Sequence, residues 1–312
     1  MLNSLGINFS GDSIFFTELS SEAGIIKLEN AEELKTDFSF EEELYKHKSN
    51  TRELTNISGE IQNYLNRRNL QNVHISAAMG TSQAFLITLP VDFSGGKQAL
   101  NSKIYWELSN YFPDNYNDFI INTYRMNSIL PCKDSDEFLI IAVPKNSLEF
   151  IKRVFGICHA ELKLVDIDHF AAENAFRINY SEQAGDKNIL LIGLKKGRVD
   201  YGFISDKKYK FYGTSKYSSD PEFNLSIIRK INSLLASPKF QKGVDVIYLY
   251  GNEISLDTVE SLRKSGLAEV EIMNPFESIN ASDKFLKDED LRKNSYRFAA
   301  SCGAALRNLA VN

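Results

Sequence analysis

The sequence predicts a two-lobed α/β fold, and three observations support this prediction. Predicted strands and helices alternate along almost the whole chain, as in layered proteins of the α/β and α+β classes. Two hairpins, at residues 5–19 and 189–204, share one pattern: an apolar strand, a polar turn with glycine, and a second apolar strand. They lie about half a chain apart in 312 residues, a length that suffices for two lobes.

The individual elements follow from hydrophobic periodicity. Apolar residues at every third or fourth position predict helices, and alternating or short continuous apolar runs predict strands. Besides the hairpins at 4–30 and 188–205, strands are expected at 73–77, 84–90, 116–126, 137–143, 165–168, 244–249 and 270–272. Helices are expected at 51–68, 97–111, 145–155, 169–177, 225–235, 255–265 and 290–309. Pro113, Pro238 and Gly266 follow three of these helices, in positions where helices commonly end.

Composition excludes several classes of protein. The chain is 43% hydrophobic and 25% charged, as in globular proteins, and its net charge of −5 is accompanied by no basic stripe of the kind that nucleic-acid binders carry. No apolar run approaches the roughly 20 residues of a membrane span, and the N-terminus does not resemble a signal peptide. Cys132, Cys158 and Cys302 are widely separated, which favours a reducing compartment. A soluble cytoplasmic protein is therefore expected, with any membrane link made through a partner.

Seven short motifs follow one another along the chain. They are LGINFSGDS at 5–13, LP followed by ELSNYFP between 89 and 113, AVPK at 142–145, VDIDHFA at 165–171, LYGN at 249–252, NPF at 274–276 and GAALR at 303–307. In this order they resemble the PilM family, the cytoplasmic actin-like proteins of type IV pilus assembly, which are related to the cell-division protein FtsA. The resemblance covers nearly the whole chain.

The resemblance implies an actin-like (ribonuclease-H-like) fold whose two lobes face each other across a nucleotide cleft. Residues 1–80 would form the first lobe, completed by about 160–185 and by a returning C-terminal helix at 296–312. Residues 81–159 would form the inserted α+β subdomain, and residues 186–295 the second lobe.

The first phosphate loop of the family carries a D-x-G pattern, and this chain departs from it. Asn8 and Ser10 stand at the Asp and Gly positions, and Phe15 stands where the family has lysine. An amide lacks the negative charge that a hard cation prefers, and a side chain at the glycine position hinders close approach of phosphate to the backbone. The resemblance nevertheless places a degenerate nucleotide site at this turn, which would include Asn8, Ser10, Gly11, Asp12 and Ser13.

The second half of the implied cleft also departs from the nucleotide-binding pattern of the family. Leu191 replaces the second aspartate, Lys195 and Lys196 follow where small and hydroxyl residues are usual, and Asn252 replaces a glycine beside the adenosine position. Gly193, Lys195, Lys196, Gly251 and Asn252 complete the degenerate site. The cofactor is expected to be either none or ATP, and no catalytic or metal-binding residue is assigned. Because both candidate carboxylates are gone, ATP hydrolysis is not expected, although an active ATPase remains the alternative.

The resemblance implies a non-catalytic job, that of a pseudo-ATPase scaffold. Such a protein would bind the N-terminal tail of a PilN-like inner-membrane protein in a groove of the inserted subdomain and connect the pilus platform to cytoplasmic motor ATPases. It would be recruited to the inner-membrane face through that partner, and relatives of this fold also self-associate. The alternatives are an FtsA-like or a type II secretion adaptor. The chain ends at Asn312 soon after the last predicted helix, so the amphipathic membrane helix of FtsA-like proteins is not expected.

Other candidate sites have simpler explanations. Cys158-His159 lacks further metal ligands at usable spacing, and SGGK at 94–97 lacks the first glycine of a P-loop. Asp166 and Asp168 lie two residues apart and are expected on one side of a strand, either lining the cleft or ending the strand and capping the next helix. Trp106 and Tyr111 fit either a partner-facing surface or a core. The run at 207–210 is expected to be a solvated hairpin tip.

Overall fold

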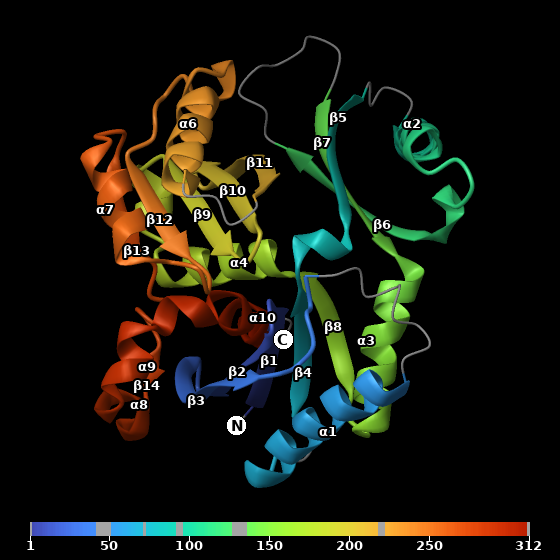
Figure 1. Ribbon diagram of the computed structural model, residues 1–312, viewed down its shortest axis with the longest axis vertical. Coiled ribbons are helices and arrows are strands. Elements are labelled where there is room, and N and C mark those ends of the chain that lie inside the picture. Colours follow the sequence, from blue (N-terminus) through green and yellow to red (C-terminus); the bar gives the residue numbers. More distant parts are fainter. Residues whose placement is uncertain are drawn as a thin grey trace.

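Two mixed sheets that share an order of five strands, to which the first adds a short edge strand, form the framework of the computed structural model. The structure describes residues 2–41, 51–70, 73–91, 96–126, 136–217 and 222–310. In both sheets, the first three strands are antiparallel neighbours, and the fourth and fifth strands add in parallel on the other side of the first. The two sheets stand on opposite sides of a central pair of helices (Figure 1). The predicted duplication of a hairpin is therefore one part of a duplicated sheet.

The first sheet runs in the order β14-β3-β2-β1-β4-β8. Its strands are β1 (Leu2–Ser10), β2 (Ser13–Glu22), β3 (Ile25–Lys35), β4 (His74–Met79), β8 (Leu162–Ile167) and the short β14 (Asn280–Ala281). The second sheet runs in the order β11-β10-β9-β12-β13. Its strands are β9 (Ile189–Lys195), β10 (Arg198–Ser205), β11 (Lys208–Lys216), β12 (Val246–Tyr250) and β13 (Glu269–Ile272).

Helices α4 (Asp168–Asn179) and α10 (Ala299–Ala310) fill the layer between the two sheets (Figure 1). Small residues let them approach closely, because a Cβ atom on Gly303 would lie 1.7 Å from the backbone oxygen of Ala171. A Cβ atom on Gly6 would likewise lie 1.9 Å from the backbone oxygen of Ser301, so α10 also lies directly on β1. The central core combines side chains of both sheets and both helices, among them Phe15, Ala78, Ala175, Leu191, Tyr248 and Ala304.

The outer faces of the two sheets are covered by other helices. On the first sheet, α1 (Thr51–Arg67) and α3 (Lys145–Ile157) enclose a core that includes Ile7, Phe9, Ile61 and Phe155. On the second sheet, α6 (Phe223–Leu235) and α7 (Leu256–Lys264) enclose a core that includes Ile192, Phe203, Ile231 and Leu262. Successive side chains of β1 and β9 point to opposite faces of their sheets. One set of side chains therefore packs in an outer apolar core, and the other set faces the other lobe.

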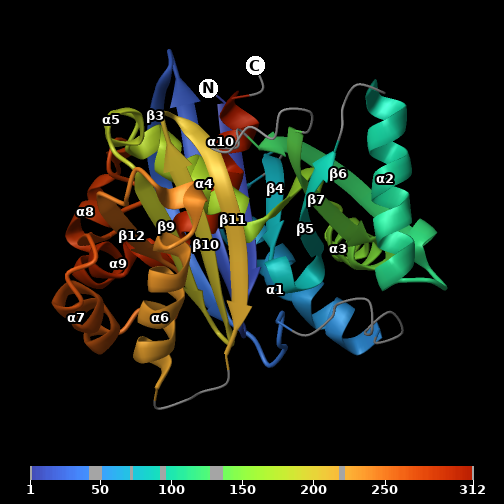
Figure 2. The same cartoon turned by 90° about the horizontal axis from the view of Figure 1, so that it is seen from above.

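A third, antiparallel sheet projects from the first lobe in the order β5-β7-β6. It consists of β5 (Phe85–Val91), β6 (Phe119–Met126) and β7 (Asp136–Pro144), and α2 (Gly96–Tyr111) covers one face (Figure 2). Leu100, Ile104 and Leu108 of α2 pack on Phe138 and Ile140 of β7. This subdomain corresponds to the predicted insertion, although α3, which the sequence placed within 81–159, contributes to the core of the first sheet.

Three sequence expectations differ from the structure. The predicted terminal helix is divided into α9 (Glu289–Lys293), a 3-10 turn (Ser295–Phe298) and α10. The expected strand at 116–126 begins with a 3-10 turn (Tyr116–Asp118). Residues 207–210 are more than an exposed tip, because Lys208 begins β11 and the Tyr209 side chain is partly buried.

Short elements complete the described chain: α5 (Gln183–Asp186), α8 (Asp283–Lys287) and 3-10 turns at Thr81–Gln83 and Pro238–Phe240. Among the described helices, none combines the length and the apolar character that crossing a bilayer demands. Cys132 and the first two residues of the SGGK stretch lie outside the described residues.

Candidate functional site

Three loops meet where the two lobes face each other. The turn Gly11–Asp12 follows β1, the turn Lys196–Gly197 follows β9, and Gly251–Asn252 follows β12. A Cβ atom on Gly11 would lie 3.2 Å from Nδ2 of Asn252 and 3.9 Å from Cβ of Lys196. The three loops that the family resemblance assigned to one site therefore lie next to one another.

Asn8 and Ser10 are buried on β1. Asn8 is paired with Phe15 of β2 and with Ala78 of β4, and within the described residues its Oδ1 accepts no hydrogen bond. Phe15 packs in the central core, so the position at which the family carries a lysine is apolar and enclosed. This part of the hairpin offers neither a carboxylate nor a cation.

The side chains of Asp12 and Ser13 are directed to partners within the first lobe. Lys35 donates to Oδ1 of Asp12 over 2.9 Å, and this hydrogen bond lowers the pKa of the Asp12 carboxyl. The hydroxyl of Ser13 donates to Oε1 of Glu33 over 2.8 Å. Both predicted site residues therefore help to hold the turn against β3.

Gly193 and Gly251 are required for packing. A Cβ atom on Gly193 would lie 2.5 Å from the hydroxyl of Tyr250. Gly251 has a φ of +112°, and a Cβ atom there would lie 2.2 Å from the backbone oxygen of Leu194. Each glycine allows β9 and β12 to meet closely near the junction of the lobes, which is a structural reason for glycine that needs no ligand.

Lys195 belongs to a buried ion network at the junction of the lobes. Its Nζ lies 2.7 Å from Oδ2 of Asp168 and 2.9 Å from Oδ2 of Asp200. Arg198 joins the same carboxylates, with Nη2 at 2.7 Å from Asp168 Oδ2 and Nε at 3.2 Å from Asp200 Oδ2. All four side chains are at least 95% buried. Thr81 and Tyr212 each donate to Oδ1 of Asp200 over 3.0 Å.

The charges of this network stabilise one another. Burial raises the pKa of the Asp200 carboxyl, but the positive charges of Arg198 and Lys195 outweigh it and hold that pKa well below its ordinary value. For Arg198, burial lowers the guanidinium pKa, and the charges of Asp168 and Asp200 raise it above its ordinary value. Asp200 and Arg198 therefore remain ionised although they are excluded from water.

His169 lies beside the network and is held by two tyrosines. Its Nδ1 lies 2.7 Å from the hydroxyl of Tyr250, and its Nε2 lies 3.0 Å from the hydroxyl of Tyr209. Burial lowers the pKa of the imidazole to about 4, so the ring is neutral at pH 7. Gly202 makes room for it, because a Cβ atom there would lie 2.6 Å from Nε2.

The two aspartates at the end of β8 diverge. Asp168 is the first residue of α4 and belongs to the buried network, whereas Oδ2 of Asp166 accepts a hydrogen bond from Nε of Arg307 on α10. The alternative role of Asp168 as a helix cap is not observed, because Ile167 occupies the N-cap position. Only Asp168 reaches the junction of the lobes.

These residues do not fit a magnesium nucleotide. The backbone N–H of Gly11 already donates to Oε1 of Glu41 over 3.2 Å, and the cations Lys195 and Arg198 are already bound by carboxylates. A hard cation needs carboxylates that are not committed to cations of the protein. In the described ranges, moreover, no three His, Cys, Asp or Glu side chains gather closely enough to hold a metal. The donors and carboxylates at this place are thus already paired within the chain.

Sequence reasoning missed Glu41, Arg198 and Asp200. Arg198 and Asp200 alternate on an otherwise apolar strand, with Lys195 just across the turn, and this signal could have predicted a buried charged face. Glu41 gives no such signal, because it begins a run of three glutamates that reads as exposed surface.

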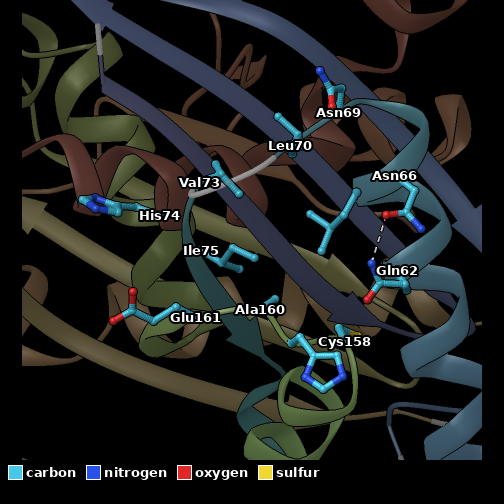
Figure 3. A pocket seen from close by; sticks show the side chains of 12 residues that line it. Gln62, Asn66, Asn69, Leu70, Val73, His74, Ile75, Cys158, Ala160 and Glu161 are labelled. Atoms are coloured by element: carbon cyan, nitrogen blue, oxygen red, sulfur yellow. Dashed lines mark hydrogen bonds between the residues drawn. The ribbon is translucent and has the colours of Figure 1, made fainter.

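The Cys158-His159 stretch borders a separate pocket of about 670 Å³ between α1, β4 and the end of α3 (Figure 3). The thiol of Cys158 donates to the backbone oxygens of Ser58 and Val154, both at 3.1 Å, and burial raises its pKa to about 11. These are features of a packed structural cysteine. Trp106 and Tyr111, in contrast, are exposed on α2, at 57% and 54%.

Comparisons with known proteins place the fold. No family model matches the chain, and no curated protein matches it either. Among solved structures, a chain of a PilM-PilN type IV pilus biogenesis complex matches with a TM-score of 0.77 at 15% identity, covering 98% of both chains.

Two further structures match more distantly. A Bacteroides thetaiotaomicron protein with an actin-like ATPase fold and unknown function has a TM-score of 0.50 at 13% identity, covering 89% of this chain and 92% of its own. The ethanolamine utilization protein EutJ from Carboxydothermus hydrogenoformans also has a TM-score of 0.50, at 12% identity, covering 98% and 90%. The predicted actin-like fold, similar to that of PilM, is confirmed.

Proposed function

We propose that this chain is an actin-like adaptor of a type IV pilus or related secretion platform, which binds the N-terminal tail of a PilN-like inner-membrane protein. The observation that carries the proposal is the match to a chain of a PilM-PilN complex over 98% of both chains. Because that coverage extends over both lobes and the projecting sheet, it includes the part in which a peptide groove is expected. Binding to such a partner would recruit the protein to the cytoplasmic face of the inner membrane.

A pocket on the projecting subdomain is our candidate for the tail. It has a volume of about 210 Å³ and lies between the start of β5, the end of α2 and the start of β6. The rings of Phe85 and Phe112 are 5.2 Å apart, and those of Phe112 and Phe119 are 4.8 Å apart, which gives an apolar wall. Asn115, Asp118 and Asn146 add polar groups to the lining.

This combination suits an extended peptide. Such a peptide places apolar side chains in pockets and satisfies its backbone by hydrogen bonds. Within the described sheet, β6 is an edge strand that pairs only with β7, so its outer edge can add a further strand. Ile120 and Tyr124 of β6 are 43% and 55% exposed, which makes this edge partly apolar.

We also propose that the adaptor works without hydrolysing ATP. Asn8 offers no carboxylate, and the two buried aspartates at the junction are bonded to Lys195 and Arg198. Contacts with motor ATPases and self-association would then depend on surfaces of the lobes rather than on nucleotide turnover.

Isothermal titration with the N-terminal tail peptide of the cognate PilN-like protein tests the proposal. We expect saturable binding, equal with and without ATP and magnesium. Asp118→Arg would place a long cationic side chain at the pocket and should weaken binding roughly ten-fold, a change of ~1.4 kcal/mol.

Asp114→Arg is the matched control, because Asp114 is exposed nearby, makes the same charge change and does not line the pocket. It should bind like the unmodified chain. An absence of binding to the tail would overturn the adaptor function, and equal weakening by both variants would overturn the choice of pocket. Release of phosphate from ATP by the purified chain would favour the active-ATPase alternative.

A further inference from the structure

The carboxylate of Glu41 lies between the lobes and is surrounded by hydrogen-bond donors. Its Oε1 accepts from the backbone N–H of Gly11 over 3.2 Å and from the hydroxyl of Ser10 over 3.5 Å. Its Oε2 accepts from the hydroxyl of Ser82 over 3.3 Å. The side chain is 15% exposed, so these contacts are largely shielded from water.

The second lobe supplies a cation to the same place. Nη1 of Arg198 lies 3.7 Å from Oε2 of Glu41, and within the described residues this nitrogen makes no hydrogen bond. Its position is fixed closely, because a Cβ atom on Gly80 would lie 3.0 Å from Nη1. A guanidinium nitrogen of a buried side chain is therefore directed at an anion from the opposite lobe.

The backbone around Glu41 holds it at this position. The N–H of Phe40 donates to the backbone oxygen of Gly11 over 2.7 Å, and the N–H of Thr36 donates to that of Asp12 over 2.8 Å. The side-chain amide of Gln83 donates to the backbone oxygen of Phe40 over 3.0 Å. The segment that carries Glu41 is thus fastened to the very turn whose N–H the carboxylate accepts.

A turn N–H, two hydroxyls and a guanidinium are the donor set of an oxyanion site. We propose that Glu41 is a built-in anion, which takes the place of a phosphate ligand between the lobes. The carboxylate joins Gly11, Ser10 and Ser82 on one side to Arg198 on the other, so the lobes are bridged without a bound nucleotide. Removal of this carboxylate exposes a site for a phosphate-type oxyanion, either inorganic phosphate or the terminal phosphate of a nucleotide.

The inference goes beyond the adaptor function and does not depend on it. It explains why an actin-like chain can keep the shape of its phosphate turn although the chemistry at Asn8 and Phe15 has changed. The turn retains an anion, and the anion is covalently part of the chain.

Thermal unfolding of Glu41→Ala tests the proposal, with inorganic phosphate or ATP added at constant ionic strength. We expect no phosphate-dependent shift in the Tm of the unmodified chain. The variant should gain a rise in Tm of about 3 °C at ~20 mM phosphate for a Kd of ~1 mM. The ATP series shows whether the remainder of a nucleotide adds affinity to that of phosphate alone.

Glu32→Ala is the matched control. It removes one carboxylate of the same lobe, which pairs with Arg67 away from the junction, and it should show no response to phosphate. Ser82→Ala in the Glu41→Ala background should weaken phosphate binding roughly five-fold, because one donor is lost.

Glu41→Ser provides a second route if the alanine variant does not fold. It also removes the carboxylate and empties the space between the donors, so phosphate should stabilise it as well. A folded Glu41 variant that does not respond to phosphate would overturn the proposal. So would an unmodified chain that phosphate stabilises as strongly as the variants, since its own anion would then not fill the site.

Discussion

The ammonium group of Lys195 lies 2.7 Å from Oδ2 of Asp168, and this ion pair joins the last residue of β9 to the first residue of α4. The same Nζ lies 2.9 Å from Asp200 on the neighbouring strand. Lys195 was assigned from the family resemblance to an anion-binding turn. In the structure its charge is already balanced by Asp168 and Asp200. The second hairpin therefore has a structural role, since Lys195 acts as a joint that fastens it to α4.

Replacing Lys195 by methionine should therefore destabilise the fold. Asp168 and Asp200 would then share Arg198 as their remaining cation, and removal of one partner of a buried ion pair typically costs about 3–5 kcal/mol. Chemical denaturation monitored by circular dichroism measures the free energy of unfolding. Lys264→Met is the control, because Lys264 forms an exposed pair with Glu260 over 3.2 Å and should change stability by less than about 0.5 kcal/mol. Equal stability of both variants would contradict a role for Lys195 as a joint.

The neutral state of His169 predicts a pH dependence of stability. Burial lowers the folded-state pKa to about 4 from an ordinary value of 6.5. Between these values the unfolded chain binds a proton that the folded chain does not, so the free energy of unfolding should fall as the pH is lowered from 6.5 to 4. The free energy of unfolding should fall by roughly 3 kcal/mol in total as the pH reaches 4. Above pH 6.5 this loss is absent, because the imidazole is then neutral in both the folded and the unfolded chain.

Denaturation at several pH values checks this expectation. His169→Gln keeps one donor and one acceptor for Tyr209 and Tyr250 but does not titrate, so the slope between pH 6.5 and 4 should become smaller. His159→Asn is the control, because His159 is exposed, and it should keep the slope of the unmodified chain. The pKa of the Asp200 carboxyl is lowered, so Asp200 changes the free energy of unfolding only at more acidic pH. Its contribution therefore does not overlap with that of His169. Unchanged slopes in both variants would assign the pH dependence to other groups.

Much of the fold could be predicted because apolar strands and family motifs carry it. The outer face of β1 follows directly from its alternating Leu5, Ile7 and Phe9. The continuous apolar run at 189–192 predicts a strand that is buried on both faces, as β9 is. The third strand of each sheet was harder to predict. β3 and β11 are rich in charged residues, since they lie toward the sheet edges and need fewer apolar side chains.

The site was less predictable because its contacts join distant parts of the chain. The contact of Glu41 with Arg198 depends on how the lobes meet, and no local pattern encodes this. Gly193 and Gly251 were interpreted as ligand-binding glycines, whereas close packing against Tyr250 and Leu194 accounts for them. A glycine at such a turn can thus be required by packing alone.

The contact between α4 and α10 gives the last prediction. A Cβ atom on Gly303 would lie 1.7 Å from the backbone oxygen of Ala171 and 3.2 Å from the backbone nitrogen of Ala175, so neither neighbour can move as a side chain could. Gly303→Ala should force α10 away from α4 and cost about 3 kcal/mol or more, at the upper end of overpacking effects. Gly156→Ala is the control, because Gly156 lies within α3 and a Cβ atom there meets nothing within 4 Å. It should stabilise the chain by up to about 1 kcal/mol through helix propensity. Opposite shifts in Tm are therefore expected from the same chemical change, and a Gly303→Ala variant as stable as Gly156→Ala would show that the two central helices can separate without loss of the core.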